Sequence, residues 1–271
     1  MRLIIWLCLF FSLTFTMCLP VEGNDKNPAY KRVLLIVSYH LGQPWTAELT
    51  NEISEGIRKY PEPCVMDVLS LDSWRMGDAS AIRERFKPYL EKIRGGFYDL
   101  IIAADDDAVE LMFENYASKP ENVPFIFCGY ENYSPSLRTK YKNMTGVTQE
   151  YDLESTIRVG LRLMPDTKEI VLLTDSSARG ERQEAAIRAK LLKDQEFPIK
   201  FSFLSNKNST LPQLRSKLKG LPIDSFLVLL PRLHVYKEGY GSMTALALDL
   251  KEYAPSPFFS LTSQTLGHGS L

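Results

Sequence analysis

The sequence predicts an α/β protein of two Rossmann-like lobes, each built on a parallel sheet and joined by a hinge. Short apolar runs alternate with longer amphipathic stretches from Lys31 onward, a pattern typical of parallel strands connected by crossover helices. The alternation occurs as two successive series, separated by a turn-rich stretch over 133–151. With 271 residues, 45% of them hydrophobic, the chain is long enough for two cores, and this composition argues against disorder, collagen or coiled coil.

The first series predicts four strands and three helices. Its strands are continuous apolar runs, such as VLLIV at 33–37, as expected for strands that helices cover on both faces. Its helices are longer stretches in which apolar residues recur at helical spacing. The predicted strands are 33–38, 64–69, 100–103 and 125–128, and the predicted helices are 45–59, 79–93 and 108–116.

The second series repeats the pattern with four helices and four strands. We place 24–145 in the N-terminal lobe and 146–271 in the C-terminal lobe, with 146–150 as a hinge strand. The predicted helices are 153–163, 181–195, 210–219 and 243–253, and the predicted strands are 169–173, 199–204, 225–230 and 258–261. A doubly wound lobe of strand order 2-1-3-4 is expected for the first series.

Residues 1–23 are interpreted as a signal peptide. Arg2 gives a positive start, 3–19 is apolar without a charge, and Val21 and Gly23 are small residues before a cleavage site. An uncleaved anchor is the alternative, because about 18 apolar residues just span a bilayer. Both interpretations predict a periplasmic or extracellular protein, which contacts a membrane only through an uncleaved signal.

Cysteine and histidine usage predicts free thiols and no metal or cofactor. Cys8 and Cys18 fall in the signal peptide, so Cys64 and Cys128 are the only pair left in the mature chain. The order 2-1-3-4 places Cys64 on an edge strand and Cys128 on a strand far from it, so we expect two buried free thiols. A disulfide or a metal pair is the alternative. The three histidines are scattered without metal-ligand spacing.

Charge and motifs favour a binding protein over an enzyme or a nucleic-acid-binding protein. With 32 Lys+Arg against 33 Asp+Glu, the net charge of -1 gives no long-range field that attracts phosphate backbones. The turn after the first strand, 38–45, contains one glycine, too few to cradle a pyrophosphate. No phosphate-loop or GxSxG motif occurs, so we expect no catalytic residues. An exported enzyme on the same scaffold and a non-binding remnant are the alternatives.

The candidate ligand-binding residues follow the strands of both lobes. Parallel α/β sheets bind ligands at the carboxyl ends of their strands, and here those positions hold hydroxyls, carboxylates, aromatic rings and an arginine. Such a set suits a cleft that holds a small polar or aromatic molecule. The candidates are Ser38, Tyr39, Trp45, Asp105, Gly129, Tyr130, Glu131, Asp175, Arg232 and Thr262.

For several of these candidates, a role other than ligand binding is the alternative. The aspartates at 105–107 suit a divalent cation, a helix cap by Asp106 or Asp107, or a ligand contact by Asp105. Tyr39 and Trp45 suit stacking on a ligand ring, whereas Trp45 equally suits packing of the first helix on the sheet.

Two candidates of the second lobe also have alternatives. Arg232 suits clamping a carboxylate or forming an interlobe salt bridge. Asp175 suits a ligand contact or a helix cap.

Six stretches at these turns carry a resemblance to a known family. They are VLLIVSYH at 33–40, PWT at 44–46, DLIIAADDDA at 99–108, VPFIFCG at 123–129, TGV at 145–147 and PDT at 165–167. In this order and spacing they resemble the substrate-binding family of ABC transporters with the type I periplasmic binding fold, particularly the branch used as extracytoplasmic sensor of histidine kinases. The resemblance covers 31–271.

This resemblance implies a two-lobed clamp that closes on a small ligand by hinge motion, without turnover. It implies an ABC permease or a membrane signalling domain as partner. By their position in the sequence, the residues that the resemblance implies as ligand contacts are Ser38, Tyr39, Trp45, Asp105, Gly129, Tyr130, Gln149, Asp175 and Thr262.

The sequence departs from that family in two places. The run DSSARG at 175–180 replaces the threonines and prolines usual in the family. The chain also ends at GHGSL, 267–271, where the family returns to the first lobe. We therefore expect a C-terminally truncated clamp with uncovered apolar surface and lowered stability.

Overall fold

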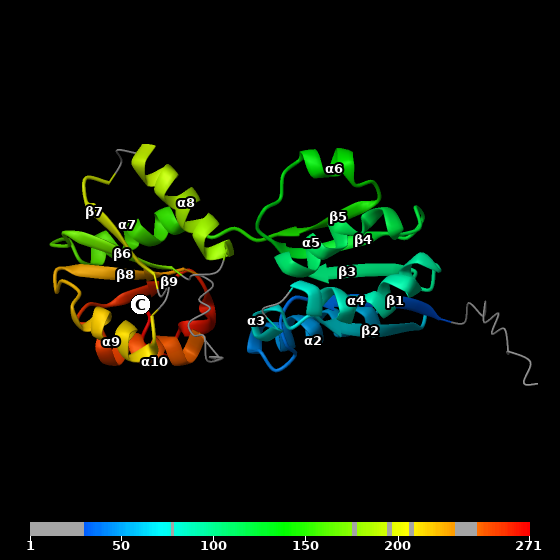
Figure 1. Cartoon of the computed structure of the whole chain (residues 1–271), viewed down its shortest axis with the longest axis horizontal. Helices are drawn as coiled ribbons and strands as arrows, with labels where there is room; N and C mark the ends of the chain where they lie inside the picture. Colours follow the sequence, from blue (N-terminus) through cyan, green and yellow to red (C-terminus); the bar gives the residue numbers. More distant parts are fainter. Residues whose placement is uncertain (1–29, 77–78, 175–177, 194–196, 206–208, 231–242) are drawn as a thin grey trace, which may run out of the picture.

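The computed structural model describes residues 30–76, 79–174, 178–193, 197–205, 209–230 and 243–271, so the predicted signal peptide lies outside it. Each lobe contains one parallel sheet with helices on both faces, and an extended linker joins the lobes (Figure 1). The predicted fold class is confirmed. Within the described ranges, no helix combines the length and apolar character needed to cross a membrane.

The first lobe has a five-stranded parallel sheet in the order β2-β1-β3-β4-β5. Its strands are β1 (Lys31–Val37), β2 (Cys64–Ser70), β3 (Leu100–Ala104), β4 (Phe125–Tyr130) and β5 (Met144–Thr148). The order 2-1-3-4 expected from the sequence is present, and β5 extends it at one edge. The strand β1, which has a neighbour on each side, is buried over 33–37 because both of its faces carry helices, as its continuous apolar run predicts.

Helices cover both faces of the first sheet. They are α2 (Pro44–Arg58), α3 (Ser73–Met76), α4 (Ala79–Arg94), α5 (Asp106–Glu114) and α6 (Ser136–Lys140), with the 3-10 turn η1 (Tyr116–Ser118). From α2, Leu49, Ile53 and Ile57 pack on one face. Phe86 of α4 and Met112 of α5 belong to the core on the other face. The short helices α3 and α6 were not predicted, because four or five residues show no helical period.

The end of the first lobe differs from the expected hinge. The strand β5 pairs in parallel with β4 from Met144 to Thr148, so it belongs to the first sheet. The predicted boundary after residue 145 falls inside this strand, and the predicted hinge strand 146–150 starts within it. Side chains 145–148 are exposed, so no apolar run marks β5 as a sheet strand in the sequence. The described chain crosses to the second lobe after Thr148 (Figure 1).

The second lobe has a four-stranded parallel sheet in the order β7-β6-β8-β9. Its strands are β6 (Glu169–Thr174), β7 (Lys200–Ser205), β8 (Ser225–Leu229) and β9 (Phe258–Ser260). Its helices are α7 (Leu153–Leu163), α8 (Ala178–Lys193), α9 (Leu211–Lys219) and α10 (Met243–Tyr253), with the 3-10 turn η2 (Ser263–Thr265). Ile157 of α7 and Ile187 of α8 pack on one face, and α9 and α10 cover the other. The expected C-terminal truncation stays a prediction.

The two cysteines of the described chain are free, as expected. Cys64 begins β2 and Cys128 lies in β4, with β1 and β3 between them. Both are half-buried rather than fully buried. Burial, together with a smaller contribution from the nearby charge of Asp105, raises the pKa of the Cys128 thiol to about 12.

We expect Cys128 to resist alkylation in the folded protein at pH 8. With a pKa of about 12, only ~0.01% of this thiol is thiolate at that pH, and the thiolate is the nucleophile. Iodoacetamide labelling followed by peptide mass spectrometry measures the rate at this site. The same chain in denaturant is the control, because unfolding restores an ordinary thiol. Equal labelling rates at Cys128 in folded and unfolded protein would contradict the prediction.

Candidate functional site

A cavity of about 210 Å³ lies where the strand ends of the two lobes meet the linker, and we call it the interlobe cleft. Carboxyl ends of parallel strands are the usual ligand-binding edge of such sheets. The first lobe contributes Tyr39, Gln43, Trp45, Trp74 and Asp105. The linker contributes Gln149, Glu150 and Tyr151, and the second lobe contributes Leu261, Thr262, Ser263 and Gln264.

An aromatic pair forms one side of the interlobe cleft. The rings of Tyr39 and Trp74 lie 4.6 Å apart between centroids, at an angle of 44°. Trp74 lies on α3, whose first residue, Ser73, donates from its backbone nitrogen (2.9 Å) and its hydroxyl (3.0 Å) to the carbonyl of Ser38. These two hydrogen bonds attach α3 to the residue that follows β1, so the two rings come from segments that are bonded to each other.

Trp45 links the start of α2 to the end of β3. Its indole Nε1 donates to Oδ1 of Asp105 at 3.3 Å, and its ring is half-buried at the cleft. Pro44 precedes it at the first position of the helix, where a proline costs no hydrogen bond. This position agrees with a stacking role, and the indole also orients the carboxylate.

Asp105 has a strained backbone. Its φ of 64° and ψ of 167° fall in a region that is nearly restricted to glycine and costs about 1–3 kcal/mol for other residues. Its backbone nitrogen donates to the carbonyl of Cys128 at 2.8 Å, and the residue is 3% exposed. Such strain concentrates at ligand-binding sites, where the surrounding structure holds it.

Asp106 and Asp107 form hydrogen bonds within the first lobe, and neither occupies the N-cap position of α5. The N-cap position is Asp105, and its side chain makes no capping hydrogen bond. Asp106 is fully buried and accepts from the backbone nitrogen of Glu131 at 2.9 Å. Asp107 accepts from the hydroxyl of Ser73 at 2.6 Å. Across the described ranges, no group of three or more His, Cys, Asp or Glu is placed to hold a metal ion.

Gly129 lies behind the interlobe cleft in the left-handed region, with φ of 70°. A Cβ at this position would lie 3.0 Å from Oδ1 of Asp105 and 3.2 Å from Oε1 of Gln149. The missing side chain therefore lets the carboxylate and the linker amide approach each other. Gln149 donates from Nε2 to the hydroxyl of Tyr151 at 2.5 Å.

Two predicted site residues lie in the interior of the first lobe. Ser38 is fully buried, and its hydroxyl donates to the carbonyl of Ala104 (2.9 Å) and accepts from the backbone nitrogen of Ala108 (2.9 Å). Tyr130 is 6% exposed and packs edge-on against Phe113. It was expected in a turn, but β4 continues through it and places its ring in the core.

The remaining candidates are divided between the interlobe cleft and other regions. Tyr39, Trp45, Asp105, Gln149 and Thr262 line the cleft. Glu131 lines a larger groove, described below, while Asp175 and Arg232 lie outside the described residues. Trp74 was missed. Trp74 follows the end of the predicted strand 64–69, and this is the same criterion by which Trp45 was selected.

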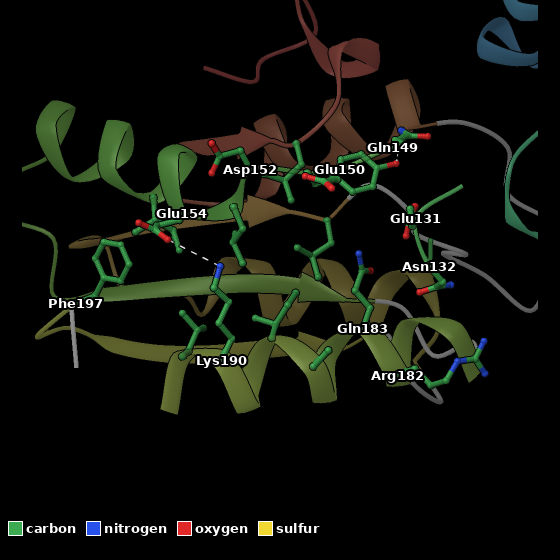
Figure 2. A pocket seen from close by; sticks show the side chains of 18 of the residues that line it. Glu131, Asn132, Gln149, Glu150, Asp152, Glu154, Arg182, Gln183, Lys190 and Phe197 are labelled. Carbon is green, nitrogen blue, oxygen red and sulfur yellow. Dashed lines mark hydrogen bonds and ion pairs between the residues drawn. The ribbon is translucent and has the colours of Figure 1, made fainter. Parts of the chain in front are cut away.

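The larger groove has a volume of about 1010 Å³ and lies between α7 and α8 beside the linker (Figure 2). We call it the hinge groove. Its apolar lining includes Ile157, Ile187 and Phe197. An ion pair of 3.9 Å between Lys190 and Glu154 connects the two helices (Figure 2).

Solved structures share the arrangement of two such lobes. A ligand-free, open substrate-binding protein with adhesive properties from Clostridium difficile has a TM-score of 0.57 at 15% identity, over 89% of this chain and 77% of its own. An ABC domain from Streptococcus pneumoniae, solved with L-Trp, has a TM-score of 0.59 at 13% identity, with the same coverage of 89% and 77%. The chain has the fold of type I periplasmic binding proteins.

The periplasmic-binding-protein fold also occurs in regulators. A dimeric Lac repressor matches with a TM-score of 0.51 at 13% identity, over 84% of this chain and 78% of that chain. No family model and no curated protein matches the sequence. The similarity is therefore one of fold, and the expected absence of a nucleic-acid partner stays a prediction.

Proposed function

We propose that this protein binds a small molecule in the interlobe cleft, outside the cytoplasm, and signals occupancy to a membrane partner. The proposal rests on one observation: the strand ends of both lobes and the linker between them line a single cavity. A ligand there contacts both lobes, so its binding energy favours one angle between them over others. The partner that reads this angle is an ABC permease or a membrane signalling domain.

The chemistry of the interlobe cleft supports binding without turnover. Its described lining offers ring faces, amides, hydroxyls and carboxylates, which orient a ligand. Histidine, which most often serves as the general base in enzymes, is absent from that described lining. The predicted signal peptide supports the proposed location.

Ligand screening tests this function. A library of small metabolites is added to the folded protein, and the melting temperature is followed, because a ligand that binds only the folded state raises it. Calorimetric titration of each hit then gives its stoichiometry. We expect at least one saturable ligand with one site per chain. A folded protein that binds no member of a broad library would contradict the proposal.

Replacing Trp45 with alanine is expected to weaken binding of such a hit about threefold to tenfold, the range for loss of one aromatic contact. Tyr60→Ala is the control, because Tyr60 is an exposed aromatic residue, 54% accessible, that does not line the interlobe cleft. Calorimetry on both variants measures the change in Kd. Unchanged affinity with a lower melting temperature for Trp45→Ala would assign this ring to packing instead.

A further inference from the structure

The strands of the first sheet begin at one edge, which faces away from the second lobe and the interlobe cleft (Figure 1). We call it the amino edge. Backbone hydrogen bonds join the segments that lead into neighbouring strands, from Lys31 to the carbonyl of Pro63 at 2.7 Å and from Asp99 to that of Arg32 at 2.8 Å. The amino edge consists of residues 30–32, 59–64, 91–99, 119–124 and 141–143, all of which the structure describes.

Exposed aromatic rings gather at the amino edge. Among the exposed large hydrophobic side chains of the described ranges, three are aromatic, and all of them lie here: Tyr30, Tyr60 and Phe97. The guanidinium of Arg32 lies 5.2 Å from the ring centroid of Tyr30 and 4.3 Å from that of Phe97. Nζ of Lys92 lies 5.1 Å from the same Phe97 centroid. Rings and cations therefore share one patch.

The amino edge carries a surplus of positive charge. Leaving aside the buried Lys119, it has six Lys or Arg against four Asp or Glu, while the whole chain has a net charge of -1. Of the carboxylates, Glu62 pairs with Lys31 at 3.8 Å, and Asp99 accepts from the backbone nitrogen of Arg32 at 2.8 Å. A positive surface with exposed rings suits a partner that offers both anionic and apolar groups.

A cavity of about 610 Å³ lies at the same edge. Val33, Ile57 and Leu100 form part of its apolar lining, and Lys31 and Tyr60 also line it. A volume of this size accommodates a small molecule or a segment of an acyl chain. Rings, cations and an apolar hollow together match the headgroups and upper acyl chains of a phospholipid surface.

The sequence that precedes the amino edge supports a membrane partner. The apolar run 3–19 is interpreted as part of a signal peptide or as an uncleaved anchor. Ten residues, 20–29, separate that run from Tyr30, and ten residues span at most about 35 Å when fully extended. An uncleaved anchor therefore holds the amino edge close to the bilayer surface.

We propose that the amino edge of the first lobe docks on a membrane surface that contains anionic phospholipids. Tyr30 and Phe97 enter the headgroup region, and Arg32 and Lys92 face lipid phosphates. This contact goes beyond the expectation that only an uncleaved signal reaches a membrane. It also leaves the interlobe cleft open to its ligand, because the two sites lie at opposite ends of the first sheet (Figure 1).

Sedimentation with sucrose-loaded vesicles tests the inference on the full chain. One set of vesicles is pure phosphatidylcholine and the other contains about 30% phosphatidylglycerol, and titration with lipid gives a partition coefficient for each. We expect at least about tenfold stronger partitioning into the anionic vesicles, because each cation near such a surface contributes about fivefold. The preference is expected to fall in about 0.5 M NaCl, which screens these charges.

Two double variants locate the contact. Lys59→Gln with Lys92→Gln removes two exposed cations of the amino edge and is expected to lower partitioning into anionic vesicles about tenfold to thirtyfold. The matched control is Lys217→Gln with Lys219→Gln, which removes two exposed cations from α9 in the second lobe and is expected to change partitioning by less than about twofold. Any N-terminal segment that the purified chain retains is common to all variants, so it cancels from the comparison.

Phe97→Ala tests the aromatic part of the contact. We expect it to lower partitioning into anionic vesicles about threefold to tenfold, because membrane binding scales with the apolar area that is buried. This variant also decides the inference if the lysine variant does not fold, as judged by its melting curve.

Each outcome of these experiments decides the inference. Equal partitioning into both kinds of vesicle would overturn it, and so would equal losses in the two double variants, which would indicate a general effect of charge. A dimer that forms without lipid and is lost in the Lys59→Gln, Lys92→Gln variant would assign the amino edge to a second copy of this chain, and would overturn the inference as well. The proposed function is tested separately by the metabolite screen, so the two failures are distinguishable.

Discussion

Gly146→Ala is expected to lower the free energy of unfolding by about 3 kcal/mol, the upper part of the usual range for overpacking a core. A Cβ at Gly146 would lie 2.2 Å from the backbone carbonyl oxygen of Phe127 and 2.5 Å from Cγ of its ring. Phe127 cannot move away easily, because it is 2% exposed and stacks on Tyr133 at 5.5 Å. The added methyl therefore forces β5 away from β4, immediately before the linker.

The matched control for this substitution is Gly56→Ala. Gly56 lies in the exposed interior of α2, and an added Cβ there has nothing within 4 Å. Alanine at such a position stabilises a helix by about 0.5–1 kcal/mol relative to glycine. Urea unfolding of both variants measures the two free energies. A Gly146→Ala protein as stable as the unsubstituted chain would show that β5 does not pack as described.

Gly129→Ala is expected to abolish most ligand binding and to cost about 1–2 kcal/mol of stability. The stability loss comes from the left-handed backbone, with φ of 70°, which disfavours any Cβ. The binding loss comes from the new methyl, which would press on Oδ1 of Asp105 and Oε1 of Gln149 at 3.0 and 3.2 Å. Displacing these two groups disturbs the floor of the interlobe cleft.

Gly267→Ala separates the two effects. Gly267 has a φ of 81°, so alanine there carries a similar backbone cost, but nothing lies within 4 Å of its added Cβ. We expect the two variants to lose similar stability and only Gly129→Ala to lose affinity for a screened ligand. Calorimetry and thermal melting measure both quantities. Equal affinities in the two variants would show that Gly129 has no part in the cleft.

The order of strands and helices was predictable because strands that are covered on both faces of a sheet are continuous apolar runs in the sequence. Runs such as 169–173 and 225–230 are strand-length and apolar, and β6 and β8 lie within one residue of those bounds. The helix α7 begins and ends where its apolar spacing predicts, and α10 ends where it is predicted to end. The sequence did not predict that β5 belongs to the first sheet, because its side chains are mostly exposed. Only its backbone pairing with β4 identifies it.

The interlobe cleft was predictable in outline and not in detail. Strand ends mark the edge of the sheet where the cavity lies, so Tyr39, Asp105 and Thr262 could be predicted to lie near it from position alone. The direction of each side chain was not predictable, because β4 continues two residues beyond the predicted strand and places the ring of Tyr130 in the core. The approach of Asp105 to Gln149 across Gly129 depends on tertiary packing, which no local pattern encodes.

Fluorine NMR of protein labelled with 5-fluorotryptophan tests most directly whether the interlobe cleft is the binding site. The chain has three tryptophans. Trp45 and Trp74 line the cleft, and Trp6 lies in the predicted signal peptide. Adding a ligand identified by the screen is expected to shift the Trp45 and Trp74 resonances together, with one Kd that agrees with calorimetry. A ligand that binds by calorimetry while both resonances stay unchanged would contradict the account.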